Sequence, residues 1–456
     1  MSASLSGKSV VVVGMARSGL SAADFLNKRG ARVKVSESRP RKAMESEIRF
    51  LEGQEIDYEV GGHLEETFLN ADLIVVSPGV PLEIPPLQQA IQAGKEIISE
   101  LELAWRFLKG KVIAITGTNG KTTTTTLIGE ILKANGSNVQ VGGNIGVALT
   151  SLIETSSSDT WNVVEASSFQ LEASPTFRPN IAIVLNITPD HLDRYNSFND
   201  YVRAKLGIFG NQSEEDFAVL NYEDSVLRQA SATIRSKVFW FSNRTEVPRG
   251  TYFDGNQLIL KDADRKEVIL LQESVPLRGR HNIENIAAAV TAANLAQVVS
   301  SRISEAVRNF KAVEHRLEYL GSIQGVQFYN DSKATNIDAT IKALEAFEGG
   351  VMLILGGRDK GGDFRVLGPL IKQKVKGVVL LGEAAGKIRA QLADSGPTVE
   401  AGSMEEAVRT AFEQADIGDT VLLAPACASF DMFQNYEHRG KAFKEVVMKL
   451  QQGSKV

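Results

Sequence analysis

The glycine-rich run Thr116-Gly117-Thr118-Asn119-Gly120-Lys121-Thr122 has the residue types that hold nucleotide phosphates. Its glycines allow successive backbone amides to turn toward a phosphate oxygen, and its lysine adds a positive charge. Thr122 begins a helix that we expect to reach Ala134, and its hydroxyl is placed to ligate a phosphate-bound Mg²⁺. A full Walker pattern would have another glycine at Ile115, so this loop is a shortened version of that motif. The run predicts an ATP site formed by Gly117, Thr118, Asn119, Gly120, Lys121, Thr122 and Thr123.

Two other polar groups follow apolar strands later in the chain. Glu165 closes the expected strand Trp161–Glu165, where an acid is placed to share Mg²⁺ with Thr122. A glutamate at this place is equally suited to cap the next turn, and the sequence leaves both roles open. His191 follows the expected strand Ile181–Asn186 in a loop rich in aspartate. Because the chain has only 5 histidines, we interpret His191 as functional rather than structural.

The elements that must position these groups repeat as strands and helices. Lys205 lies on a helix expected over Tyr201–Phe209, and its position alone indicates a solvated side chain. A hairpin is expected over Thr251–Leu271, turned at Asp254-Gly255, and a helix over Asn282–Leu295. We expect an α/β fold of three domains: a Rossmann-like N-terminal domain over 1–105, a central P-loop ATPase-like domain with a mixed sheet over 106–312, and a C-terminal Rossmann-like α/β domain over 313–456.

The chain begins with a βαβ pattern typical of mononucleotide binding. A strand over Ser9–Val13 runs into a glycine turn, a helix through Arg29 and a second strand over Arg32–Val35. Ala16 replaces the middle glycine of the dinucleotide pattern and would hinder the approach of a pyrophosphate. A turn without a ligand remains an alternative. A second strand end, Ser77-Pro78-Gly79, has the small and turn-forming residues found where open sheets bind ligands.

The last section has three strand-end loops, the first two of which mix cations, hydroxyls and glycines that suit anionic carboxylates and phosphates. They follow expected strands over Val326–Tyr329, Val351–Leu355 and Thr420–Ala424. Cys427, in the third loop, has no histidine or lysine base near it in sequence. We therefore interpret this thiol as a packing residue and not as a nucleophile.

Composition excludes several classes of protein. The 50 basic and 55 acidic residues give a net charge of -5, which offers no overall attraction to nucleic acid or to an anionic membrane. A single cysteine excludes an internal disulfide and fits a reducing compartment. We find no apolar run long enough to span a bilayer and no signal-peptide layout, so we expect a cytoplasmic protein without a membrane partner. We also expect it to act as a monomer.

Taken together, the motifs resemble the Mur ligase family, ATP-dependent amide-forming enzymes of cell-wall precursor synthesis. The ATP loop, His281-Asn282-Ile283-Glu284-Asn285, Glu314-His315-Arg316 and Asp331-Ser332-Lys333-Ala334-Thr335-Asn336 resemble family motifs. The tail from Ala424 through Gly440 is most similar to the members that add D-glutamate to UDP-N-acetylmuramoyl-L-alanine. The resemblance implies an acyl-phosphate mechanism with ATP and Mg²⁺ in peptidoglycan synthesis.

The resemblance also implies roles for individual residues. Catalysis would depend on Lys121, Glu165, His191 and Lys205, with Thr122, Glu165, His191 and a carbamylated Lys205 as metal ligands. Further ATP contacts would come from Asn282, Asn285, Arg316 and Asp331. The nucleotide and muramoyl-alanine parts would contact Arg17, Ser18, Glu37, Ser38, Arg39, Ser77, Pro78, Gly79, Asn144 and Gln170. D-Glutamate would contact Thr335, Lys360, Ser429, Phe430 and Tyr436, the last of which stands where phenylalanine is expected.

Three alternatives remain at this stage. Folylpolyglutamate synthase shares the architecture and also attaches glutamate, but it would not need a mononucleotide-binding first domain. A nicotinamide dehydrogenase is suggested only by the N-terminal βαβ pattern, against which Ala16 argues. A non-catalytic nucleotide-binding regulator is the third, and the candidate metal ligands Glu165 and His191 argue against it.

Overall fold

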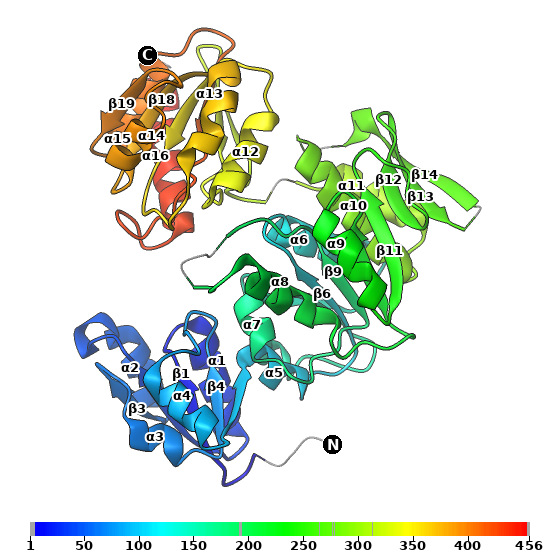
Figure 1. The fold of residues 1–456 in the computed structure, drawn as a ribbon, viewed down its shortest axis with the longest axis vertical. Coiled ribbons are helices and arrows are strands. Elements are labelled where there is room, and N and C mark those ends of the chain that lie inside the picture. The colour runs from blue at the N-terminus through cyan, green and yellow to red at the C-terminus, as the bar shows by residue number, and fades with distance from the viewer. Residues whose placement is uncertain are drawn as a thin grey trace. The chain divides into compact units, whose positions relative to one another are not determined.

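The structure is a computed structural model that describes residues 5–190, 194–263, 265–275, 277, 279–311 and 313–453. These residues form two compact units (Figure 1). The first contains the described parts of Met1–Ile187, Ser197–Ile269 and Ile286–Ala306, and the second those of Thr188–Asn196, Leu270–Asn285 and Val307–Val456.

The first unit begins with a parallel five-stranded sheet of order β3-β2-β1-β4-β5. The direction of winding reverses between β1 and β4, and ligands of open α/β sheets bind at such a switch point, beyond the carboxyl ends of the strands. The turn into α1 and the loop after β4 both leave the sheet there. The bounds are β1 (Ser9–Val13), α1 (Arg17–Lys28), β2 (Arg32–Glu37), α2 (Glu45–Gly53), β3 (Asp57–Val60), α3 (Glu65–Leu69), β4 (Leu73–Val76), α4 (Pro85–Gln92), β5 (Glu96–Ser99) and α5 (Glu100–Trp105).

The same unit continues into a nine-stranded mixed sheet of order β14-β13-β12-β11-β10-β9-β6-β8-β7. The expected hairpin is confirmed, because β12 and β13 pair antiparallel around a turn at Asp254. The bounds are β6 (Lys111–Thr116), α6 (Lys121–Ala134), β7 (Val139–Gly143), β8 (Trp161–Glu165), α7 (Ser168–Glu172), β9 (Ile181–Val184), α8 (Phe198–Leu206), β10 (Phe217–Asn221), α9 (Ser225–Ala230), β11 (Lys237–Ser242), β12 (Gly250–Phe253), β13 (Gln257–Asp262), β14 (Arg265–Leu271), α10 (Arg280–Leu295) and α11 (Ser300–Asn309).

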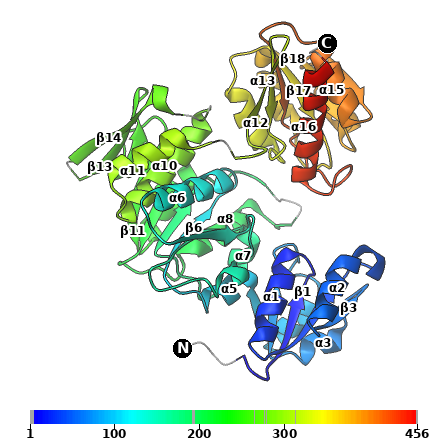
Figure 2. The same ribbon diagram turned by 180° about the vertical axis from the view of Figure 1, so that it is seen from behind.

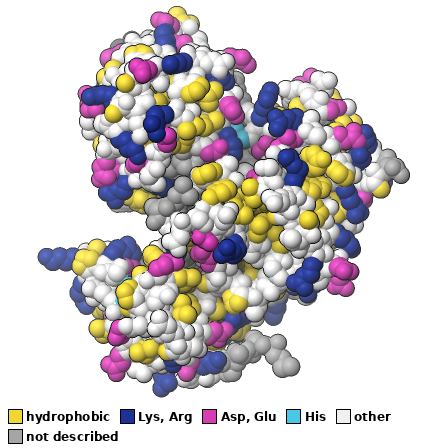
Figure 3. Space-filling model, viewed as in Figure 1, with side chains coloured by type: hydrophobic (Ala, Val, Ile, Leu, Met, Phe, Trp, Pro, Cys, Tyr) yellow, Lys and Arg dark blue, Asp and Glu magenta, His cyan; other side chains and the backbone are white. Residues whose placement is uncertain are grey.

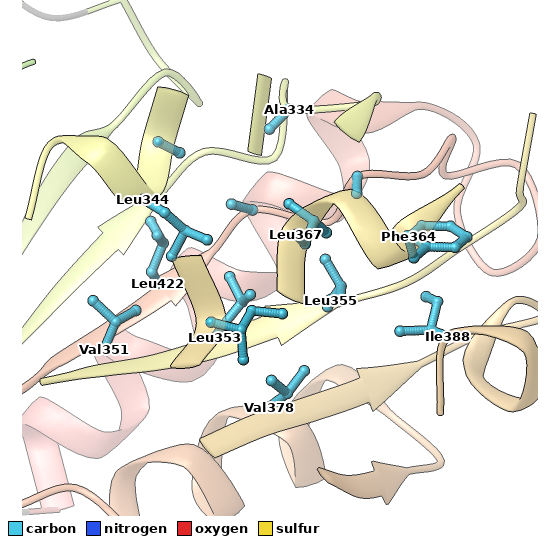
Figure 4. Close-up of a cluster of buried hydrophobic side chains, with 14 of the residues drawn as sticks. Ala334, Leu344, Val351, Leu353, Leu355, Phe364, Leu367, Val378, Ile388 and Leu422 are labelled. Atoms are coloured by element: carbon cyan, nitrogen blue, oxygen red, sulfur yellow. The ribbon is translucent and has the colours of Figure 1, made fainter. Parts of the chain in front are cut away.

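The second unit has a six-stranded sheet of order β15-β16-β20-β17-β18-β19, parallel except for β15. Alternate residues of each strand enter two cores. Leu353 and Leu355 pack with α12, α13 and α14 (Figure 4), whereas Met352 and Ile354 pack with α15 and α16. The bounds are β15 (Glu318–Ile323), β16 (Val326–Asn330), α12 (Ile337–Glu345), β17 (Val351–Leu355), α13 (Gly368–Lys374), β18 (Val375–Leu381), α14 (Ala385–Gln391), β19 (Thr398–Ala401), α15 (Met404–Glu413), β20 (Thr420–Leu423) and α16 (Tyr436–Gly453). Figure 2 shows α16 in front of this sheet.

The three sheets confirm the predicted α/β class and the mixed central sheet. The proposed boundaries at 105 and 312 stay a prediction. No helix in the described part of the chain is long and apolar enough to cross a membrane. On the face drawn in Figure 3, basic and acidic side chains are interspersed, so anionic ligands must be recognised by local groups.

Candidate active site

The predicted phosphate loop lies between β6 and α6. Gly117 has φ 141° and Gly120 has φ 88°, conformations that favour glycine. A Cβ on Gly117 would lie 3.0 Å from the Cβ of Leu185, so the loop also needs glycine for space. The ammonium of Lys121, the first residue of α6, donates to the carbonyls of Gly117 (2.8 Å) and Thr118 (2.9 Å). The loop therefore surrounds the lysine at the positive end of a helix dipole.

Asn186, which sequence reasoning left without a role, holds this loop in shape. Its backbone carbonyl accepts from the Thr118 amide at 2.8 Å. Its side-chain oxygen accepts from the Asn119 amide at 2.8 Å, and its side-chain nitrogen donates to the Asn119 carbonyl at 3.1 Å. The only signal in the sequence was its position just after an apolar strand neighbouring β6.

Thr122 and Glu165 meet as the sequence predicted. The Thr122 hydroxyl donates to Glu165 Oε2 at 2.9 Å, and Asn144 Nδ2 donates to Glu165 Oε1 at 3.1 Å. The Asn144 amide also donates to the Glu165 carbonyl at 2.8 Å. Thr122 and Glu165 are buried, at 4% and 1% exposure. A hydroxyl and a carboxylate at this separation are hard oxygen donors, which fit Mg²⁺.

Lys205 is buried at 2% exposure, so the interpretation of a solvated lysine is wrong. Its ammonium donates to the Gly117 carbonyl at 2.9 Å, the same oxygen that accepts from Lys121. It also lies 4.5 Å from the ring centroid of Tyr201, whose hydroxyl is 3.2 Å from Thr118 Oγ1. The reason is tertiary: α8 turns this face toward the phosphate loop rather than toward water.

Gln170 is buried on α7 and completes a capping box with Ser167. Its Oε1 accepts from the Ser167 amide at 2.9 Å. Its Nε2 has no hydrogen-bond partner among the described residues. A buried amide with an unused donor is suited to contact a polar ligand.

In the N-terminal sheet, Glu37 organises the segment expected to bind the nucleotide. One carboxylate oxygen accepts from the Met15 amide at 2.9 Å, and the other from the Arg39 amide at 2.9 Å; the Arg39 guanidinium adds bonds to both. Burial alone would raise the pKa of Glu37, but hydrogen bonds from Arg39 and Met15 outweigh it and lower the pKa to about 2. Ser38 also donates to this carboxylate, at 3.3 Å.

The other predicted nucleotide contacts lie around the switch point of this sheet. Arg17, the first residue of α1, donates to the Gly146 carbonyl in the loop that contains Asn144. Ser18 follows it in α1. Ser77, with Pro78 and Gly79 after it, donates weakly to the Gly14 carbonyl at 3.4 Å.

In the second unit, the positive charge of Arg316 acts on the carboxyl group of Asp331. Desolvation raises the pKa of Asp331 to about 7, against the opposing effects of Arg316 and the Leu317 amide. Asn285 Nδ2 donates to Asn282 Oδ1 at 3.2 Å.

The predicted D-glutamate contacts lie in the same unit. The Nζ of Lys360 lies 3.9 Å from Oδ1 of Asp190. Ser429 is buried, whereas Phe430 next to it in sequence is exposed. Thr335 lies in the loop between β16 and α12. The Tyr436 hydroxyl accepts from Lys333 at 2.7 Å.

Three family models cover most of the chain. The Mur ligase middle domain matches residues 115–293, the Mur ligase MurD-like N-terminal domain 8–99, and the Mur ligase glutamate ligase domain 315–427. The chain belongs to the Mur ligase family.

Curated and solved Mur ligases agree with this assignment. The UDP-N-acetylmuramoylalanine--D-glutamate ligase of Acidobacterium capsulatum is 52% identical over 97% of both chains, and that of Koribacter versatilis is 49% identical over 98% of this chain and 99% of its own. The pseudomurein peptide ligase type C of Methanothermus fervidus has a TM-score of 0.63 at 19% identity, covering 97% of this chain and 100% of its own. MurF ligase from Thermotoga maritima, solved in complex with ADP, has a TM-score of 0.61 at 16% identity, covering 99% and 97%.

For this Mur ligase, the structure brings together the described part of one predicted group, because Thr122 of the phosphate loop bonds Glu165 and Lys205 bonds the Gly117 carbonyl of that loop. Asn144, predicted to contact the muramoyl-alanine part, also bonds Glu165. The predicted nucleotide contacts gather at the N-terminal switch point, and the predicted amino-acid contacts lie in the second unit. His191 lies outside the described residues, so its role stays a prediction. Cys427 is confirmed as a packing residue, because it is 1% exposed and belongs to the same hydrophobic cluster as Leu353 and Leu355. Burial raises the pKa of its thiol to about 12.

Proposed function

We propose that this chain is an ATP-dependent ligase that joins D-glutamate to UDP-N-acetylmuramoyl-L-alanine in peptidoglycan precursor synthesis. The observation that carries the proposal is the contact of Thr122, Glu165 and Asn144 beside a glycine loop that also holds two lysines. This arrangement suits transfer of a phosphoryl group to a carboxylate. The identity of 52% with a D-glutamate ligase over nearly the full chain supports the choice of amino acid.

The reaction has two chemical steps, which follow binding of ATP at the phosphate loop. Amides of the phosphate loop and Lys121 hold the β- and γ-phosphates of ATP. An oxygen of the L-alanine carboxylate attacks the γ-phosphorus, the bond to the ADP oxygen breaks, and an acyl phosphate forms. The amine of D-glutamate then attacks the acyl carbon, phosphate leaves with its oxygen, and the nitrogen loses a proton. The products are the amide, ADP and phosphate.

Thr122 and Glu165 would hold one Mg²⁺ through their oxygens. Glu165, His191 and Lys205 would hold a second, with Lys205 carbamylated because an ammonium has no lone pair to donate. Bound Mg²⁺ would neutralise charge that develops on the phosphate oxygens. Asn144 keeps Glu165 oriented by donating to the oxygen that Thr122 does not use.

The nucleotide end of the substrate would lie at the N-terminal switch point. Glu37 accepts from the backbone amides of Met15 and Arg39 there. Its role would therefore be to hold these loops in place as well as to contact the nucleotide. Gln170 would use its free Nε2 for the muramoyl-alanine part. Asn282, Asn285, Arg316 and Asp331 would contact ATP, and Thr335, Lys360, Ser429, Phe430 and Tyr436 would contact D-glutamate. The enzyme would act as a cytoplasmic monomer without nucleic-acid partners.

Phosphate release tests this function. Purified protein is given ATP, Mg²⁺ and UDP-N-acetylmuramoyl-L-alanine with D-glutamate, L-glutamate or L-lysine in separate reactions. We expect release with D-glutamate alone and a product heavier by one glutamate residue. Release with L-lysine, or with no acceptor nucleotide present, would contradict the proposal, and a lack of release in all three reactions would refute it.

A further inference from the structure

Arg439 is a buried guanidinium whose partners in the described structure are all neutral oxygens. It lies on the first turns of α16 at 2% exposure. Its Nε donates to Ser332 Oγ at 3.0 Å, its Nη2 to the Ser332 carbonyl at 2.8 Å, and its Nη1 to the Cys427 carbonyl at 3.1 Å. No carboxylate of the described residues forms an ion pair with it. The carboxylate of Asp431 acts on it electrostatically. Removing a charge from water is costly, so a buried arginine that bonds no acid directly calls for an explanation.

The bonds of Arg439 join the ends of two neighbouring strands. Ser332 follows β16 and Cys427 follows β20, and these strands pair side by side in parallel. A third strand end is also near, since a Cβ on Gly357, just after β17, would lie 3.2 Å from Arg439 Nη1. Three loops therefore converge on one guanidinium.

The same loops contain the residues proposed to contact D-glutamate. Thr335 comes three positions after Ser332, Ser429 two after Cys427, and Lys360 three after Gly357. The Ser332 hydroxyl also donates to the Tyr436 carbonyl at 2.8 Å, which fixes the start of α16 against the first loop. A shift of any loop relative to the others would change the spacing of these contacts.

We propose that Arg439 is a positioning residue for the amino-acid substrate: it sets the spacing of the Ser332 and Cys427 loops, and its positive charge, which no carboxylate of the described residues pairs with directly, favours binding of a dicarboxylate at these loops. This inference rests on the proposed function. Burial lowers the pKa of Arg439 to about 10, so the side chain still carries its charge at neutral pH. Its hydrogen-bond partners are neutral oxygens, so more of that charge can act on an anionic ligand than if an aspartate or glutamate were bonded to it directly.

The test compares R439M and R439K with wild type in the phosphate-release assay. Methionine has no charge and no donors, while lysine keeps the charge and part of the hydrogen bonding. We expect R439M to raise the KM for D-glutamate roughly tenfold or more. The KM values for ATP and for UDP-N-acetylmuramoyl-L-alanine should stay within about twofold of wild type. R439K should recover part of the loss. The matched control R409M, in α15, removes an exposed arginine paired only with Glu405 and should leave all three constants unchanged.

The outcomes separate the inference from the proposed function. If wild type makes no product with D-glutamate, the proposed function fails. If wild type is active and R439M has an unchanged KM for D-glutamate, or raises all three KM values in proportion, the inference is overturned. Should R439M lack a cooperative melting transition, S332A carries the same comparison, because it removes one anchor of the first loop but leaves the guanidinium. An unchanged KM for D-glutamate in S332A would then overturn the proposal.

Discussion

Replacing Asn186 with alanine should weaken ATP binding through the shape of the phosphate loop. The side chain makes two hydrogen bonds with Asn119: its oxygen accepts from the Asn119 amide, and its nitrogen donates to the Asn119 carbonyl. At about 0.5 to 1.5 kcal/mol for each neutral bond, the loss is about 1 to 3 kcal/mol. Because about 1.4 kcal/mol is a tenfold change in an equilibrium constant, the apparent affinity for ATP should fall roughly 5- to 150-fold.

The assay is isothermal calorimetry with ATP, together with the KM for ATP at saturating nucleotide and D-glutamate. N186A should keep the affinity for UDP-N-acetylmuramoyl-L-alanine, because Asn186 makes no contact with the N-terminal sheet in the hydrogen bonds described for it. The control N138A removes an asparagine that bonds Ser157 and Thr160 in the same unit, and should leave ATP affinity unchanged. Wild-type ATP affinity in N186A would refute the reasoning that this side chain shapes the loop.

Three further predictions concern charged groups. K121A should abolish turnover while calorimetry still detects binding of UDP-N-acetylmuramoyl-L-alanine, since Lys121 lies in the phosphate loop and the uridine nucleotide is expected at the N-terminal sheet. Equal loss of turnover and of uridine-nucleotide binding would contradict this division of sites. K205A should regain part of its activity in added acetate, whose oxygens replace those of a carbamate, and an absence of rescue over a wide acetate range would argue against carbamylation. The pKa of Glu37 is lowered from 4.5 to about 2, so its stabilising effect is full above 4.5 and is lost as pH falls toward 2. E37Q should therefore have a lower melting temperature than wild type at neutral pH, and the difference should shrink as the pH falls from 4.5 toward 2. A difference in melting temperature that widens as the pH falls would contradict this prediction.

Much of the fold could be predicted because its strands are buried and apolar. The strands Ser9–Val13 and Val351–Leu355 agree residue for residue with the sequence expectation. Edge strands such as β3 and β19 were not predicted. Their residues are partly exposed, so they lack the continuous apolar run that marks the inner strands.

The site was predictable where one motif fixes the geometry and not where several loops converge. The meeting of Thr122 with Glu165 follows from two strands that end at the same edge of a sheet. Burial of Lys205 depends on how α8 packs, which local spacing does not contain. Arg439 lies on α16 and bonds the loops of Ser332 and Cys427, more than 100 and more than 10 residues away in sequence. Its role could therefore not be assigned from local spacing.

Cys427 can report on the opening of the hydrophobic core of the second unit. It is the chain's only thiol and is sealed in the core of the second unit at 1% exposure, with a pKa of about 12 through burial. Alkylating reagents react with thiolate, so they can modify it only in molecules whose core has opened. The labelling rate therefore measures how often this core opens under native conditions, without any introduced probe. It also shows whether a bound substrate slows that opening.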